Sequence, residues 1–105
     1  MKKSNLNHAE MLSVLTKELA NTPIDTDWEQ TKLLTVATTG YMFGLCDRLY
    51  SEYKKLVVVN KSGLHPYNSK EDVIKYETYD NNIKVFEIHS VKGEYSIEEV
   101  EIENN

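Results

Sequence analysis

The chain has 105 residues, of which 40% are hydrophobic and 28% charged, the size and composition of one globular domain and not of a disordered segment. Its formal net charge of −5 argues against nucleic acid as a direct partner, because nonspecific affinity for phosphate comes from lysines and arginines that displace counterions. The longest uncharged stretch, Leu33 to Cys46, has fourteen residues, fewer than the ~20 needed to cross a bilayer.

The first predicted helix begins after Asn7. Asn7 and Glu10 have the spacing of a capping box, in which each side chain accepts a hydrogen bond from the other residue's backbone amide. Apolar residues between Met11 and Leu19 recur at intervals of three and four, which predicts one buried stripe. Pro23 ends the helix because proline has no amide hydrogen to donate.

A second, long helix is predicted over about 26–54. Thr26 and Glu29 repeat the capping-box spacing at its start. Apolar residues then follow at four-residue intervals and are expected to cover the core: Leu33, Ala37, Tyr41, Leu45, Leu49 and Tyr53. The weak point is Gly40, which follows two β-branched residues and disfavours helix by roughly 1 kcal/mol. A kink at Gly40 is compatible with this pattern.

The second half of the chain predicts a sheet. Leu56 to Val59 is a β-branched run that fits either a buried strand or the docked end of the second helix. The asparagine, serine, glycine and proline residues within 60–68 predict a loop. Three segments of alternating polar and apolar residues follow at about 73–79, 83–91 and 94–102. Asp80-Asn81-Asn82 and Lys92-Gly93 are the expected hairpin turns. Ser69 with Asp72 is the alternative, a cap for one helical turn.

These elements predict a single α+β domain over residues 1–105. Its helical part covers about 7–54 and its sheet part about 56–102, with two N-terminal helices packed on a C-terminal antiparallel sheet of three to four strands. Cys46 lies inside the apolar run, as a buried thiol in a reducing compartment would. We therefore expect a cytoplasmic protein.

Acidic residues dominate the second half. Residues 56–105 carry ten acidic and five basic side chains, and no base follows Lys92. Tyrosine is common in interfaces because it combines a large ring with a polar tip. We therefore predict an exposed partner-binding surface that contains Tyr67, Glu94, Tyr95, Glu98, Glu99 and Glu101. The alternative is that these glutamates protect a terminal edge strand against aggregation.

A two-residue turn at Lys92-Gly93 pairs residues whose numbers sum to 185, and so places Glu87 beside Glu98 with His89 on the same face. Paired carboxylates near a histidine suit acid–base chemistry or a divalent cation. The pairing of the neighbouring segment would set Tyr76 opposite Glu87. Against a site, the spacing of Ile97 and Val100 suggests a β-bulge at Glu98-Glu99 that would separate the carboxylates.

Other chemistry has no supporting pattern. The histidines and Cys46 lack the spacing of a metal site, and the glycines form no phosphate-binding loop. We expect neither a cofactor nor enzymatic activity. Ala37, Gly40 and Gly44 place small side chains on one helix face, where the first helix or a second copy of the chain could approach closely.

Lysine, asparagine, isoleucine and tyrosine make up 33 of the 105 residues, and their AT-rich codons suggest a low-GC bacterium or its mobile elements. In composition the chain is similar to phage-encoded inhibitors of host enzymes and to toxin immunity proteins. We therefore expect a non-enzymatic protein-binding module, a phage or mobile-element inhibitor whose acidic, tyrosine-containing surface blocks the basic nucleic-acid-binding groove of a host enzyme. The alternatives are a small enzyme or ligand-binding domain that uses Glu87, His89 and Glu98, a toxin-immunity protein, and a dimeric structural protein.

Overall fold

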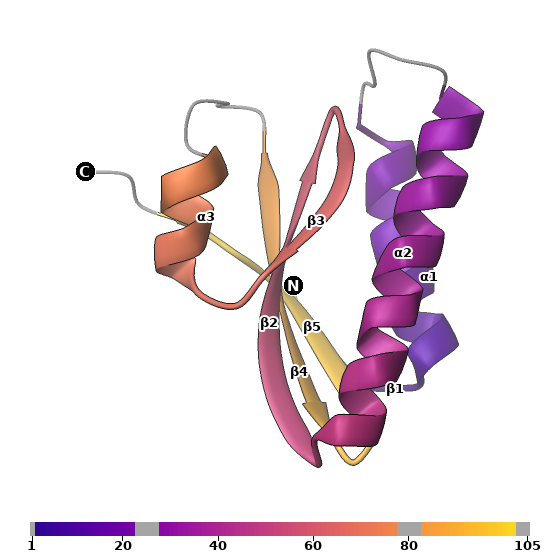
Figure 1. Ribbon diagram of the computed structural model, residues 1–105, viewed down its shortest axis with the longest axis vertical. Helices are drawn as coiled ribbons and strands as arrows, with labels where there is room; N and C mark the ends of the chain where they lie inside the picture. Colours follow the sequence, from indigo (N-terminus) through magenta and orange to yellow (C-terminus); the bar gives the residue numbers. More distant parts are fainter. Residues whose placement is uncertain (1, 23–27, 78–82, 103–105) are drawn as a thin grey trace.

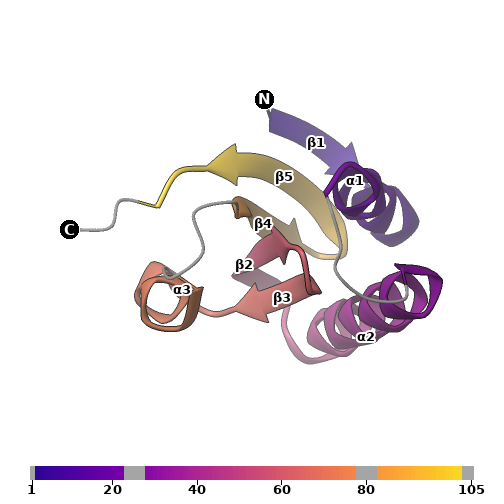
Figure 2. The same cartoon turned by 90° about the horizontal axis from the view of Figure 1, so that it is seen from above.

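A computed structural model describes residues 2–22, 28–77 and 83–102. The elements, in chain order, are β1 (Lys2–Leu6), α1 (His8–Ala20), α2 (Trp28–Leu49), β2 (Glu52–Asn60), β3 (Gly63–Tyr67), α3 (Lys70–Glu77), β4 (Lys84–Val91) and β5 (Glu94–Val100). The strands form one antiparallel sheet in the order β1-β5-β4-β2-β3. Helices α1 and α2 cover one face of this sheet and α3 covers part of the other (Figures 1 and 2).

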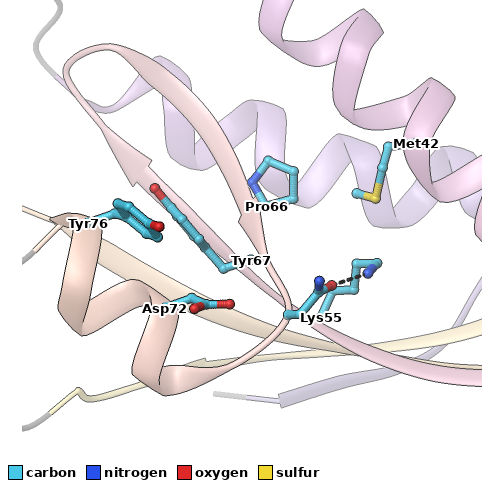
Figure 3. A pocket seen from close by; sticks show the side chains of 7 residues that line it. Met42, Lys55, Pro66, Tyr67, Asp72 and Tyr76 are labelled. Carbon is cyan, nitrogen blue, oxygen red and sulfur yellow. Dashed lines mark hydrogen bonds between the residues drawn. The ribbon is translucent and has the colours of Figure 1, made fainter.

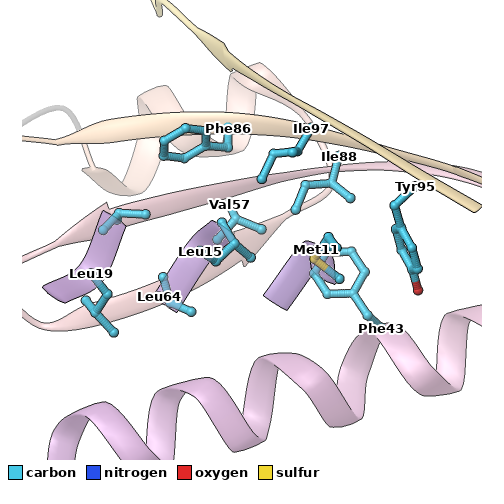
Figure 4. Packing of buried hydrophobic residues seen from close by; sticks show 11 residues of the cluster. Met11, Leu15, Leu19, Phe43, Val57, Leu64, Phe86, Ile88, Tyr95 and Ile97 are labelled. Carbon is cyan, nitrogen blue, oxygen red and sulfur yellow. The ribbon is translucent and has the colours of Figure 1, made fainter. Parts of the chain in front are cut away.

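The main core lies between the sheet and the pair α1 and α2. The apolar stripe of α1 is fully buried at Met11, Leu15 and Leu19, as predicted. Its partners come from α2 and from four strands (Figure 4): Phe43, Val57, Val59, Leu64, Phe86, Ile88, Tyr95 and Ile97. A smaller cluster under α3 contains Leu56, Val58, Val73 and Val85. Successive side chains of a strand point to opposite faces, so the unbroken apolar run of β2 places one side chain after another in the two clusters.

Local signals predicted α1 and the final hairpin correctly. Asn7 and Glu10 form both hydrogen bonds of the capping box, at 2.8 and 2.9 Å. Lys92 and Gly93 have φ values of 52° and 79°, as a two-residue hairpin turn requires. The register of β4 and β5 sums to 185 throughout. The bulge expected at Glu98-Glu99 is wrong, because the pairing continues without a break to Val100.

The sheet has five strands, not three or four, and begins at Lys2, far before the predicted start at residue 56. β1 pairs with β5, which is therefore not an edge strand. β3 lies within the segment predicted to be a loop, and it contains Pro66. Proline is tolerated there because β3 is the last strand in the sheet, where one side of the backbone needs no partner.

Two further predictions, one of a strand and one of the end of a helix, also need correction. The segment predicted as a strand over 73–79 is instead helix α3 up to Glu77, and Ser69 accepts a hydrogen bond from the amide of Asp72 at 3.2 Å, as the alternative expected. Helix α2 ends at Leu49, so Tyr53 belongs to β2. The helix continues through Gly40 without a break. The predicted turn at residues 80–82 and the predicted cap formed by Thr26 lie outside the described residues.

Candidate functional site

The predicted acidic surface does not form one patch. Along β5, Glu94 and Glu98 lie on the α3 side of the sheet, whereas Glu99 lies on the side of α1 and α2, because alternate residues face opposite ways. Glu101 is exposed beyond the end of β5. Glu99 shares a shallow cavity with lysines, and Glu98 lies opposite Lys2 of β1. A single acidic recognition surface would need all four carboxylates on one side.

The two tyrosines predicted to be exposed are not free recognition groups. Tyr95 is 1% exposed and belongs to the main core, so its predicted exposure is wrong. The odd-numbered residues of β5 face α1 and α2, and Tyr95 is one of them. Tyr67 is half-buried, and its hydroxyl donates a hydrogen bond to Glu77 at 2.7 Å.

The alternative site around Glu87 is assembled in part. Glu87 does pair with Glu98, and His89 lies two residues further along the same strand and face. However, Nε2 of His89 lies 2.7 Å from a carboxylate oxygen of Glu52, not from either of the paired glutamates. The residue opposite Glu87 on the other side is Leu56, so the pairing predicted for Tyr76 is wrong. Among residues 2–22, 28–77 and 83–102, no three histidine, cysteine or carboxylate side chains are placed to hold a metal ion.

A serine and a histidine meet at the turn between β2 and β3. Oγ of Ser62 lies 2.7 Å from Nε2 of His65, the spacing of a nucleophile and its base. The hydroxyl of Ser62 also donates to Oδ1 of Asn60 at 2.7 Å, so Asn60 and His65 both contact this one hydroxyl. Asn60 in turn donates to the buried carboxylate of Glu77 at 3.0 Å. The arrangement therefore links the turn to α3.

A cavity of about 380 Å³ opens at the β3 edge, between α2 and α3 (Figure 3). Its lining is Met42, Lys55, Pro66, Tyr67, Asn68, Asp72 and Tyr76. Nζ of Lys55 donates to the side chain of Asn68, and the hydroxyl of Tyr67 is engaged by Glu77. Much of the polar lining thus already forms hydrogen bonds within the protein. A ligand site would instead have several polar groups that point into the cavity and are available to a ligand.

The small-residue face of α2 is divided between two environments. Gly40 is buried against α1: a Cβ atom placed there would lie 2.8 Å from Cδ1 of Leu12, and Nε2 of His8 is 3.0 Å from the Gly40 carbonyl oxygen. Close packing on the first helix, one of the two expected partners, is confirmed at this position. Ala37 is exposed, and a Cβ atom at Gly44 would have no neighbour within 4 Å. These two positions face outward.

The outer side of α2 is the most unusual surface of the described protein. Leu33, Leu34, Tyr41 and Leu49 are between 68% and 71% exposed. The buried side of the helix instead carries Thr39, Gly40, Phe43 and Cys46, so the predicted burial of the four-residue stripe is wrong for these large side chains. No other described element covers the outer side (Figure 2). Contiguous exposed apolar surface of this kind marks interaction sites in soluble proteins.

The N-terminal half of α2 is held to the sheet by Thr35. Its hydroxyl donates to the backbone carbonyl of Leu64 at 3.0 Å and accepts from the Leu64 amide at 2.7 Å. Gly63 allows this approach, since its φ of +119° favours glycine and a Cβ atom there would lie 2.9 Å from the Thr35 hydroxyl oxygen. This contact fixes the rotation of α2 about its axis.

The C-terminal end of α2 is held by Asp47. The hydroxyl of Tyr53 donates to one carboxylate oxygen at 2.6 Å, and the hydroxyl of Tyr95 donates to the other. Ser90 Oγ lies 3.4 Å from the first of these oxygens. Burial, and then the hydrogen bond to Asp47, raise the pKa of Tyr53 and Tyr95 well above 10. With both ends of α2 anchored, its outer face is presented on a rigid support.

Comparison with known proteins adds no further assignment, since no protein-family model, curated protein or solved structure matches this chain. No helix among the described residues is both long and apolar enough to span a membrane.

Proposed function

We propose that the chain is a non-enzymatic protein-binding module whose working surface is the outer face of α2. One observation carries the proposal: four large apolar side chains on one anchored helix are each more than two-thirds exposed. Keeping such side chains in water sacrifices burial worth roughly 1.5–3 kcal/mol for each leucine. A binding partner that covers these side chains recovers this free energy, whereas folding of the chain by itself does not. The exposed face therefore has a role in binding.

Partner binding through the acidic residues of β5 has less support, because these glutamates point to two sides of the sheet. Inhibition of a host enzyme stays a prediction. It can be tested in the same experiment as the α2 face, by reversing Glu98, Glu99 and Glu101 to lysine.

The test is capture of a binding partner by the tagged chain in cells of its natural host. We expect Leu34→Lys to abolish capture, since it places a charge in the exposed apolar face without touching the core. The variant with Glu98, Glu99 and Glu101 reversed to lysine should retain the partner. The opposite result, loss with those three lysines and retention with Leu34→Lys, would return recognition to the acidic residues and overturn our proposal. Circular dichroism of each variant establishes that it is folded.

A further inference from the structure

We infer that the polypeptide covering α2 is a second copy of this chain, in a two-fold dimer whose α2 helices pack antiparallel with Tyr41 at the axis. This inference rests on the proposed function and names its partner. It follows from the distribution of large and small side chains about Tyr41, from the lack of charge along the face, and from its area.

The exposed arc of α2 is centred on Tyr41. At about 100° per residue, the residues within about 80° of Tyr41 between positions 30 and 49 are Gln30, Leu33, Leu34, Ala37, Thr38, Gly44, Leu45, Arg48 and Leu49, together with Thr31, whose side chain is not described. All nine of the first group are exposed or half-buried. The only formal charge among them is at Arg48, near the end of the helix. Between Leu33 and Leu45 the arc contains only apolar residues, threonine and glycine.

A two-fold axis through Tyr41 makes this arc complementary to itself. In an antiparallel pair, residues at equal distances on either side of Tyr41 lie at the same level along the two helices, so the numbers of residues that share a level sum to 82. Leu45 then shares a level with the partner's Ala37, and Thr38 shares one with the partner's Gly44. Each of these levels thus holds one larger and one smaller side chain, which allows close helix packing.

The ends of the arc match in the same register. Leu33 shares a level with Leu49 of the partner subunit, one on each flank of the interface, and both are about 70% exposed in the single chain. Leu34 faces the partner's Arg48, whose aliphatic stem can cover it while the guanidinium reaches water. No charged group is buried opposite an apolar one. A parallel pairing would instead set each residue against its own copy, with Ala37 against Ala37 and Leu45 against Leu45, and would lose the match of sizes.

The area is adequate for a dimer. Leu33, Leu34, Tyr41 and Leu49 at 68–71% exposure offer on the order of 600 Å² of surface, and the smaller residues of the arc bring the face close to the ~800 Å² per partner of a standard interface. A single helix face therefore suffices without rearrangement of the fold.

The first experiment measures mass by sedimentation equilibrium. The chain has a mass of 12.2 kDa, and we expect twice that value at micromolar concentration. Tyr41→Glu should give the single-chain mass, because it sets two carboxylates against each other on the axis. Tyr76→Glu is the matched control: Tyr76 is 52% exposed on α3, which covers the other face of the sheet from α2 (Figure 2), and its variant should remain dimeric.

The second experiment tests the register. Leu34→Lys should be monomeric, because it sets an ammonium group against the partner's Arg48, but an equimolar mixture with Arg48→Glu should form a heterodimer, since the new ammonium and carboxylate groups face each other in the antiparallel pairing about Tyr41. A Leu34→Lys protein that still dimerises, or a mixture that forms no heterodimer while the parent dimerises, would overturn the arrangement.

The outcomes separate this inference from the proposed function. A parent chain that remains monomeric up to about 100 μM overturns the dimer alone, provided that Leu34→Lys still abolishes capture of another protein in cells. If the parent is monomeric and Leu34→Lys leaves capture unchanged, the inference and the proposed function fail together.

Discussion

Two tyrosines donate to Asp47, the buried Tyr95 and the half-buried Tyr53, and this pair predicts that the protein loses stability in alkali. Burial and the neighbouring carboxylate raise the pKa of Tyr53 and Tyr95 above the ordinary value of 10.0. In the folded protein both hydroxyls therefore keep their protons at a pH at which the unfolded chain releases them. Ionisation then stabilises the unfolded state, so the stabilising contribution is complete below pH 10 and declines as the pH rises above it.

The magnitude follows from the ionisation of the unfolded chain. At pH 11, one pH unit above the ordinary pKa, deprotonation stabilises each unfolded tyrosine by about 1.4 kcal/mol, or about 3 kcal/mol for the pair. Single domains have unfolding free energies of about 5–15 kcal/mol, so the loss is a large share of the total. It should lower the urea midpoint by about 2 M for a domain of this size.

The assay is urea unfolding followed by circular dichroism at pH 8 and pH 11. Lysines also titrate in this range, so the decisive comparison is with the double variant Tyr53→Phe/Tyr95→Phe. That variant should be less stable at pH 8, because Asp47 loses two donors, but its midpoint should change much less between the two pH values. An equal pH dependence in the parent and the double variant would refute the assigned role of these hydroxyls.

Four further substitutions test individual contacts by urea unfolding in the Tyr41→Glu background, which removes any effect of association. Gly44→Ala, with open space around it, should stabilise by up to about 1 kcal/mol through helix propensity. Gly40→Ala gains the same propensity, but its new methyl group meets Leu12, so it should be less stable than Gly44→Ala by about 1–3 kcal/mol; equal effects at both positions would contradict the packing of α1 on Gly40. Glu77→Ala should cost about 2–5 kcal/mol, because two donors lose their buried acceptor, and a loss below 1 kcal/mol would show that water replaces it. Lys92→Asn should stabilise the hairpin by about 0.5–1 kcal/mol, since asparagine tolerates the left-handed φ of 52° better than lysine, and a less stable protein would argue against this turn geometry.

The elements that could be predicted from the sequence are those whose signals are local. The capping box at Asn7 and the positive-φ turn at Lys92-Gly93 depend only on residues a few positions apart, and both occur where expected. The strands β1 and β3 were missed for different reasons. β1 is short and polar, and only its pairing with the distant β5 makes it a strand. β3 contains Pro66, which normally indicates a loop and is accepted here only at the sheet edge.

The small residues Ala37 and Gly44 of the candidate site were singled out from the sequence, but its large side chains were assigned to the core because α2 is apolar on both sides. The four-residue spacing of the apolar residues from Leu33 to Leu49 correctly predicted a helix, but it could not show which apolar ridge faces the core. Burial of Phe43 and the contact of Gly40 with α1 decide that question, and both depend on tertiary packing. A signal was present, since an amphipathic surface helix normally carries charged residues on its outer side and the stretch from Leu33 to Cys46 has none.

The place of β1 in the sheet has a consequence for the order of folding. Lys2 pairs with Glu98 far along the chain, so β1 leaves the ribosome long before the strand that it pairs with. Until β5 has been made, α1 has no complete surface on which to bury Met11, Leu15 and Leu19. Contacts of such long sequence separation slow folding, and the nascent chain must keep α1 soluble until β5 has emerged.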